Sequence, residues 1–187
     1  RTTLKLPESQ AQLVGKRPYL AGTTICVLPF ADQRPDQSSI GVYRDNIQRQ
    51  TTSTYDPQRP VGELVQSLVA STYASAGATV VSDGACTVQI GGEVRALSVT
   101  VDGMMAGEET FGEIELRVAI FDAAGFAIGA QTLSKQFTDE SRASESMLGA
   151  ELERLVAELI DHEGIVALID TARSNGAVAT LDNPAAV

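Results

Sequence analysis

The stretch that decides the fold is residues 111–121, which read FGEIELRVAIF. Apolar side chains occur at every second position of this stretch: Ile114, Leu116, Val118 and Ile120. The positions between them carry Glu113, Glu115 and Arg117. Successive side chains of a strand point to opposite faces of a sheet, so this alternation predicts a strand with one face in a core and one in water. The turn residues at 122–125 and the run at 126–137 predict a returning strand in a hairpin.

An apolar sheet face needs a cover, and two segments have the pattern of amphipathic helices. The first begins at Pro60 and ends before Gly77, with apolar residues at helical spacing: Val61, Leu64, Val65, Leu68 and Val69. Proline at the start and glycine after the last turn are the preferred ends of a helix. The second covers residues 145–161 after a capping Ser144, with its stripe at Leu148, Leu152, Leu155, Val156 and Leu159.

Further strands are predicted outside the hairpin. Residues 24–30 form a run that is apolar on both faces, which is typical of a strand inside a sheet. Residues 78–81 and 86–101 continue the β pattern, and 40–44 with 51–55 suggest a ribbon. We therefore expect an α+β fold, with a mostly antiparallel sheet of four to five strands and two amphipathic helices packed on one face.

The organisation along the chain is that of one domain with two ends. Residues 1–23 are polar and broken by prolines and glycines, so we expect an extended arm. Residues 24–173 form the domain, with a long insertion at 31–59. Residues 165–172 are short and apolar, either a last helical turn or a docked tail, and 174–187 are expected to be a loose tail.

Charge and hydropathy exclude some classes of protein. The 187 residues carry 24 acidic and 14 basic side chains, for a net charge of −10. The charge is uneven, since residues 1–60 have a net charge of +3 and residues 61–187 of −13. An acidic surface repels phosphates, so we expect no nucleic-acid partner. Runs of about 18 apolar residues, which a spanning helix needs, do not occur.

Candidates for catalysis are few. His162 is the only histidine and lies just past a predicted helix end, without an evident catalytic or metal-binding partner. Phosphate-loop motifs and paired metal-ligand spacings do not occur, so we expect neither a cofactor nor a metal. Cys26 and Cys86 both lie on predicted strands. They form either a disulfide or two buried free thiols.

The insertion holds the remaining candidate. Asp32 and Arg34 follow the first buried strand and are two positions apart, so they either lock the loop by a charge-assisted bond or bind a ligand. A partner surface at this loop would also use the side chains nearby: Ile40, Tyr43, Arg44 and Tyr55.

The order of these elements resembles a known family. The segment VLPFADQRP at 27–35, the pair Ile40–Gly41, the helix of 60–77 and the strand of 78–81 together resemble the YajG-type bacterial lipoproteins. The later meander and helix resemble the wider group of envelope proteins that share the fold of the TolB amino-terminal domain. This resemblance implies a periplasmic protein that is tethered to the outer membrane by a lipid, does not span it and is not an enzyme.

We therefore expect an interaction or assembly module whose partners are envelope proteins or its own subunits. Two alternatives stay open. The first is a ring-forming accessory lipoprotein of a secretion or export system, and hence an oligomer. The second is a small-ligand-binding protein or enzyme that uses the Asp32/Arg34 loop.

Overall fold

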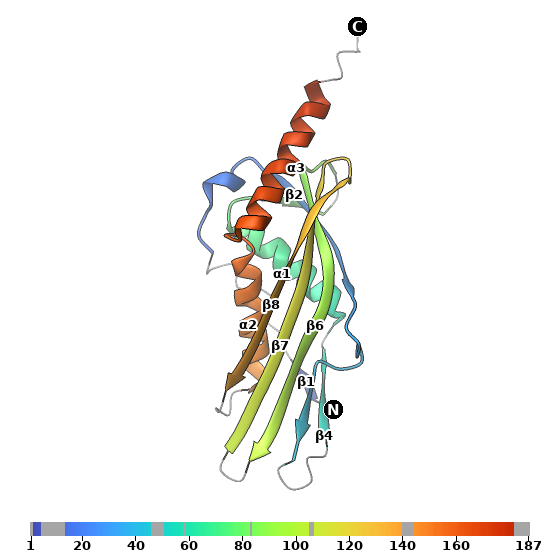
Figure 1. Ribbon diagram of the computed structural model, residues 1–187, viewed down its shortest axis with the longest axis vertical. Helices are drawn as coiled ribbons and strands as arrows, with labels where there is room; N and C mark the ends of the chain where they lie inside the picture. The colour runs from blue at the N-terminus through green and yellow to red at the C-terminus, as the bar shows by residue number, and fades with distance from the viewer. Residues whose placement is uncertain are drawn as a thin grey trace.

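The molecule is elongated, and its longest strands run along its long axis (Figure 1). This computed structural model describes residues 2–4, 14–45, 51–57, 59–82, 84–104, 107–139 and 144–181. Strands β6 (Val88–Met104), β7 (Gly107–Asp122) and β8 (Ala127–Asp139) form an antiparallel meander. Leu116 of β7 pairs with Val94 of β6 and with Leu133 of β8.

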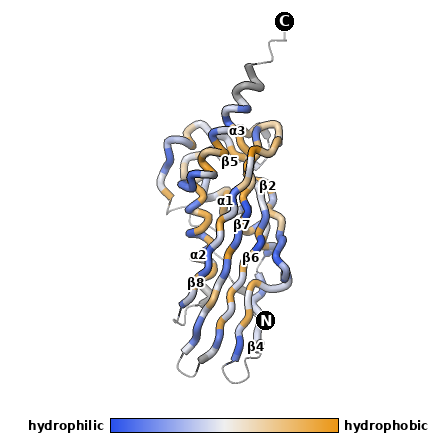
Figure 2. The backbone as a smooth tube through the Cα atoms, viewed as in Figure 1, coloured by the Kyte–Doolittle hydropathy of each residue, from blue (hydrophilic) through white to orange (hydrophobic). Residues whose placement is uncertain are grey.

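The predicted inner face of β7 is confirmed. Its four apolar residues are fully buried: Ile114, Leu116, Val118 and Ile120. Polar and apolar residues alternate along the meander (Figure 2), as expected of strands with one face in the core. Val88, Ile90 and Val94 extend the same buried surface onto β6.

The sheet is larger than predicted and mixed. Strands β2 (Thr24–Asp32) and β3 (Gly41–Arg44) both run parallel to β6, β2 along its first half and β3 along its second. Strand β5 (Thr79–Val81) is parallel to β2, β4 (Thr51–Pro57) antiparallel to β3, and β1 (Thr2–Leu4) parallel to β4. Within the described residues the sheet thus has eight strands of mixed direction, where we expected four to five mostly antiparallel strands. The predicted ribbon of 40–44 with 51–55 is confirmed as β3 and β4.

Three helices, rather than two, cover the inner face. They are α1 (Val61–Ser75), α2 (Ser144–Glu158) and α3 (Glu163–Leu181). The apolar stripes predicted for α1 and α2 are buried. Four residues separate the third helix from the end of α2, and Ile165, Ile169 and Ala172 are buried at helical spacing against β7 and β8. Residues 165–172, expected to be a last helical turn or a docked tail, are therefore part of a full helix.

Both chain ends differ from the expected arm and tail. Residues 14–23 contain a 3-10 turn, Pro18–Leu20, and Leu20 is fully buried. The backbone N–H of Arg17 donates to the carbonyl of Ala76 at 2.7 Å, which fastens this segment to the end of α1. At the other end, α3 extends to Leu181, beyond residue 173 where we expected a loose tail to begin (Figure 1).

Helix α1 lies unusually close to β2. A Cβ atom added at Gly62 would collide with the backbone carbonyl oxygen of Phe30. The strand backbone cannot yield as a flexible side chain would, so only glycine fits at this point of the helix.

We predict that Gly62→Ala lowers the free energy of unfolding by about 2 kcal/mol, because helix and strand must move apart. Urea denaturation followed by circular dichroism measures the change. Gly164→Ala is the matched control, since its added Cβ meets only the side chain of Gln131. The control should change stability by less than about 1 kcal/mol. Equal losses in both variants would contradict the close packing at Gly62.

Candidate functional site

The loop between β2 and β3 spans a break along one edge of β6. The last β2 residue paired with β6 is Asp32, opposite Val94, and the first of β3 is Gly41, opposite Val99. Neither strand reaches the middle of β6 between these two pairs. A buried backbone left without hydrogen bonds is costly, so the loop must provide donors there.

Arg34 provides them. Its Nε and Nη2 atoms each donate to the carboxylate of Asp32 at 2.8 Å. Its Nη1 donates to the carbonyl of Ser39 at 2.8 Å and, more weakly, to that of Leu97 on β6 at 3.4 Å. The Arg34 side chain is almost fully buried. The guanidinium thus joins the loop to the unpaired part of β6.

The electrostatics of the pair match this structural role. Partial burial acts to raise the pKa of Asp32, but the hydrogen bonds and charge of Arg34 outweigh it and leave the pKa below its usual value. Gln37 adds a bond from its amide to the carbonyl of Asp32 at 2.6 Å. The polar atoms of Asp32 and Arg34 are therefore used mainly by each other and by the loop.

The other residues predicted for a partner-binding loop divide into two groups. Ile40 and Tyr55 are buried and belong to the hydrophobic core. Tyr43 is half-buried, with its ring beside Gly103, and Arg44 is exposed on β3. Of the predicted set, only Tyr43 and Arg44 offer side-chain surface near the ribbon.

A groove of about 560 Å³ lies beside this loop and is lined in part by Arg34, Ser39, Arg95 and Glu115. It continues into a ladder of charges on the outer sheet face, opposite the helices. Arg95 Nε lies 2.9 Å from Glu93, and Arg117 lies 3.5 Å from the same carboxylate. Arg95 also lies 3.8 Å from Glu115. These side chains are about one-third exposed, so the ladder faces solvent.

His162 lies past the end of α2, as predicted, and also directly before the first residue of α3. Its backbone carbonyl accepts from the N–H groups of Ile165 and Val166 at 2.9 and 3.0 Å. Its Nδ1 atom accepts from the N–H of Ile165 at 3.4 Å. The imidazole thus lies at the N-terminus of α3, a helix that the sequence analysis expected only as a last turn or a docked tail.

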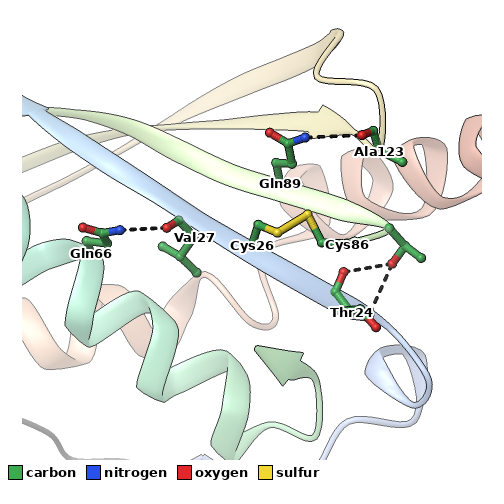
Figure 3. Close-up of a disulfide and its surroundings, with 8 residues drawn as sticks. Thr24, Cys26, Val27, Gln66, Cys86, Gln89 and Ala123 are labelled. Carbon is green, nitrogen blue, oxygen red and sulfur yellow. Dashed lines mark hydrogen bonds between the residues drawn. A yellow bond between two sulfur atoms is a disulfide. The ribbon is translucent and has the colours of Figure 1, made fainter. Parts of the chain in front are cut away.

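Cys26 and Cys86 form a disulfide, with their Cα atoms 5.7 Å apart (Figure 3). Of the two alternatives left open by the sequence, the structure has the bonded one. The bond ties β2 to the residues before β6 and closes a sequence separation of 60 residues. Thr87, beside Cys86, adds a hydrogen bond from its hydroxyl to the carbonyl of Thr24 at 3.0 Å.

A second groove, of about 760 Å³, lies between α1 and α2. Glu153 on α2 lines it and is 7% exposed, and its Oε1 atom is buried without a hydrogen-bond partner. The sequence did not single out Glu153, because it lies next to the apolar stripe of α2 and has the spacing of a solvated position. Leu68 and Thr72 of α1 line the same groove.

Two absences concern the described part of the chain. Within residues 14–45, 51–57, 59–82, 84–104, 107–139 and 144–181, acidic, cysteine and histidine side chains nowhere form a group of three suited to a metal ion. None of the described helices is both long enough and apolar enough to cross a membrane.

Comparison with known proteins identifies the fold. Neither a protein-family model nor a curated protein matches the chain. A crystal structure of a Xanthomonas campestris protein of the DUF330 family superposes with a TM-score of 0.57 at 14% identity, over 91% of this chain and 99% of that chain. A PelC dodecamer from Paraburkholderia phytofirmans gives a TM-score of 0.46 at 14% identity, over 82% and 92% of the two chains. A lipoprotein from Neisseria meningitidis gives 0.41 at 11% identity, over 74% and 99%. The first likeness shows that the chain shares its fold with the DUF330 protein along nearly its whole length.

We predict that Arg34→Ala lowers the free energy of unfolding by about 3 kcal/mol, because it leaves Asp32 and buried carbonyls unpaired. Arg34→Lys should recover little of this loss, since an ammonium group cannot form the forked bonds. Arg95→Ala is the control, and loss of its exposed ion pairs should cost less than about 1 kcal/mol. A small effect of Arg34→Ala in urea denaturation would contradict its role in the sheet break.

We predict that reduction of the Cys26–Cys86 disulfide lowers the free energy of unfolding by about 4 kcal/mol, because the unfolded chain regains the entropy of an open loop. Chemical denaturation with and without a phosphine reductant measures the difference. The double variant Cys26→Ser/Cys86→Ser should be as unstable as the reduced protein and insensitive to the reductant. A variant that is as stable as the oxidised protein would count against the bond.

Proposed function

We propose that this protein is a non-enzymatic interaction module of the bacterial cell envelope. It acts in the periplasm, tethered to the outer membrane by a lipid as the YajG-type resemblance implies. Its partners are other envelope proteins or further copies of itself. The contact surface is the outer face of the sheet, with the charge ladder of Glu93, Arg95, Glu115 and Arg117.

The observation that carries this proposal is the one-sided cover of the sheet. All three helices pack on the inner face, and the outer face of β6 and β7 keeps its charged side chains at the surface. Both signs of charge alternate across two strands, so the surface can pair with a complementary one in a defined register. The groove beside Arg95 and Glu115 gives this face a concave region.

The disulfide bond supports the proposed location in the periplasm. Disulfides form and persist in oxidising environments such as the periplasm and are rare in the cytosol. The Cys26–Cys86 bond joins strand β2 to the residues just before β6, so it is part of the folded framework.

A non-enzymatic role is supported by how the reactive side chains are used. Asp32 and Arg34 bind one another and the backbone around the break in the sheet. The imidazole of His162 lies against the first turn of α3. Neither group converges with a second acid or base as a catalytic pair would.

Self-association is a second form of the same proposal. Within the described residues, β8 pairs only with β7, which leaves a 13-residue strand at an edge of the sheet. Unpaired edges favour addition of another strand. Light scattering coupled to size-exclusion chromatography tells a monomer from a ring-forming accessory protein.

We predict that Arg95→Glu/Arg117→Glu abolishes co-purification of envelope partners after cross-linking in cells, because the outer face then carries only negative charge. The folded state should survive, since the altered side chains are partly exposed. Far-ultraviolet circular dichroism and the unfolding midpoint check this.

Arg154→Glu is the matched control, because it makes the same chemical change on α2 at an exposed position. Partners lost in the outer-face variant and retained in the control would support the proposed surface. Partners retained in the outer-face variant would overturn it.

A further inference from the structure

The groove between α1 and α2 is lined by both apolar and polar residues. Val14, Leu68, Ala150 and Ala157 supply apolar surface, and Glu153 lines the groove with them, beside further charged side chains that include Arg17, Arg154 and Asp161. The volume of about 760 Å³ lies within the range of small-molecule and side-chain binding sites. The lining residues of α2 recur every three or four positions from Ala150 to Glu158, so the groove follows the helix.

Glu153 is the unusual member of this lining. The residue is 7% exposed, and its Oε1 atom is buried and has no hydrogen-bond partner among the residues that the structure describes. Burial raises the pKa of this carboxyl. An unsatisfied buried oxygen destabilises a protein, so a folded chain that keeps one has usually another use for it.

The neighbouring acidic side chains of the same helix region are paired with cations. Glu151, equally buried, lies 2.6 Å from the ammonium group of Lys135 and also contacts Arg154. Asp161 accepts two bonds of 2.7 Å from Arg17 at the end of the groove. Glu153 lacks such a cation, although it is as buried as Glu151.

We propose that the α1–α2 groove binds an organic cation, an ammonium or guanidinium group carried on an apolar stem, with Glu153 as its counter-charge. The cation takes the place beside Glu153 that Lys135 takes beside Glu151. The stem lies against Leu68 and the two alanines. This site is separate from the outer sheet face, so the inference does not depend on the proposed function.

The charges of the groove favour a cation over an anion. Of its two guanidinium groups, that of Arg17 is bonded to Asp161 and that of Arg154 lies against Glu151. An anionic ligand would therefore lie beside the carboxylates of Glu153 and Glu158. A neutral apolar ligand would cover Glu153 without giving it a donor, which adds to the cost of its burial. A cation with an apolar stem can pair its charge with Glu153 and place its stem against the apolar lining residues. Free aliphatic amines have this chemistry, and so do lysine and arginine side chains of a peptide.

The test is a nuclear magnetic resonance titration of the full chain with hexylamine, at a salt concentration that screens the general negative charge. We expect shifts at residues lining the α1–α2 groove and at least tenfold weaker binding of 1-hexanol, which has the stem without the charge. Glu153→Gln should weaken hexylamine binding at least tenfold. The same variant should unfold at an equal or higher urea concentration, since it removes an uncompensated buried carboxyl.

Glu158→Gln is the matched control, because it removes one negative charge from the same groove at an exposed position. Its hexylamine affinity should stay within twofold of the unaltered protein. A second titration uses a blocked tripeptide with a central lysine and its norleucine analogue. If the lysine peptide binds more tightly than hexylamine, the site is supported and its natural ligand is a peptide side chain. If hexylamine binds more tightly, the site is supported and its natural ligand is a free amine. Equal affinities of Glu153→Gln and the unaltered protein for hexylamine would overturn the proposal.

Discussion

The inner face of the β6–β7–β8 meander is the constraint on which the rest of the structure depends. Ile114, Leu116, Val118 and Ile120 would each be exposed to water on one side of an open sheet. Their burial contributes about 1.5–3 kcal/mol per side chain, which is why the helices gather on this side. All three stripes of α1, α2 and α3 point to that surface. The outer face remains polar because nothing in the chain requires it to be covered.

A long central strand creates a second problem, which the loop after β2 solves. Two shorter strands, β2 and β3, pair with the same edge of β6 and leave a gap between them. The buried guanidinium of Arg34 supplies hydrogen bonds at the gap and is neutralised by Asp32. Of the two roles that the sequence left open for Asp32 and Arg34, these hydrogen bonds match the structural one. The same loop lines the groove beside Arg95.

The acidic side chains of the protein serve different purposes according to their surroundings. On the outer face, Glu93 and Glu115 share arginines in a solvated ladder, which offers specificity more than stability. On α2, Glu151 is held by Lys135, while Glu153, in the groove between α1 and α2, has a buried Oε1 atom without a hydrogen-bond partner. The net charge of −10 is thus spread over two different surfaces. On the outer sheet face the charges are paired, and in the groove between α1 and α2 the carboxylate of Glu153 has no counter-charge among the described residues.

The sequence by itself determined the local elements of this protein. Alternation over residues 111–121 predicted β7 and its buried face, and helical spacing after Pro60 predicted α1, because both patterns depend only on the backbone periods of strand and helix. The tertiary structure decided what depends on contacts between distant segments. It made the sheet mixed by placing β2 and β3 beside β6, and it joined Cys26 to Cys86. The burial of Glu153 likewise depends on how α1 and α2 approach each other, which no pattern within α2 records.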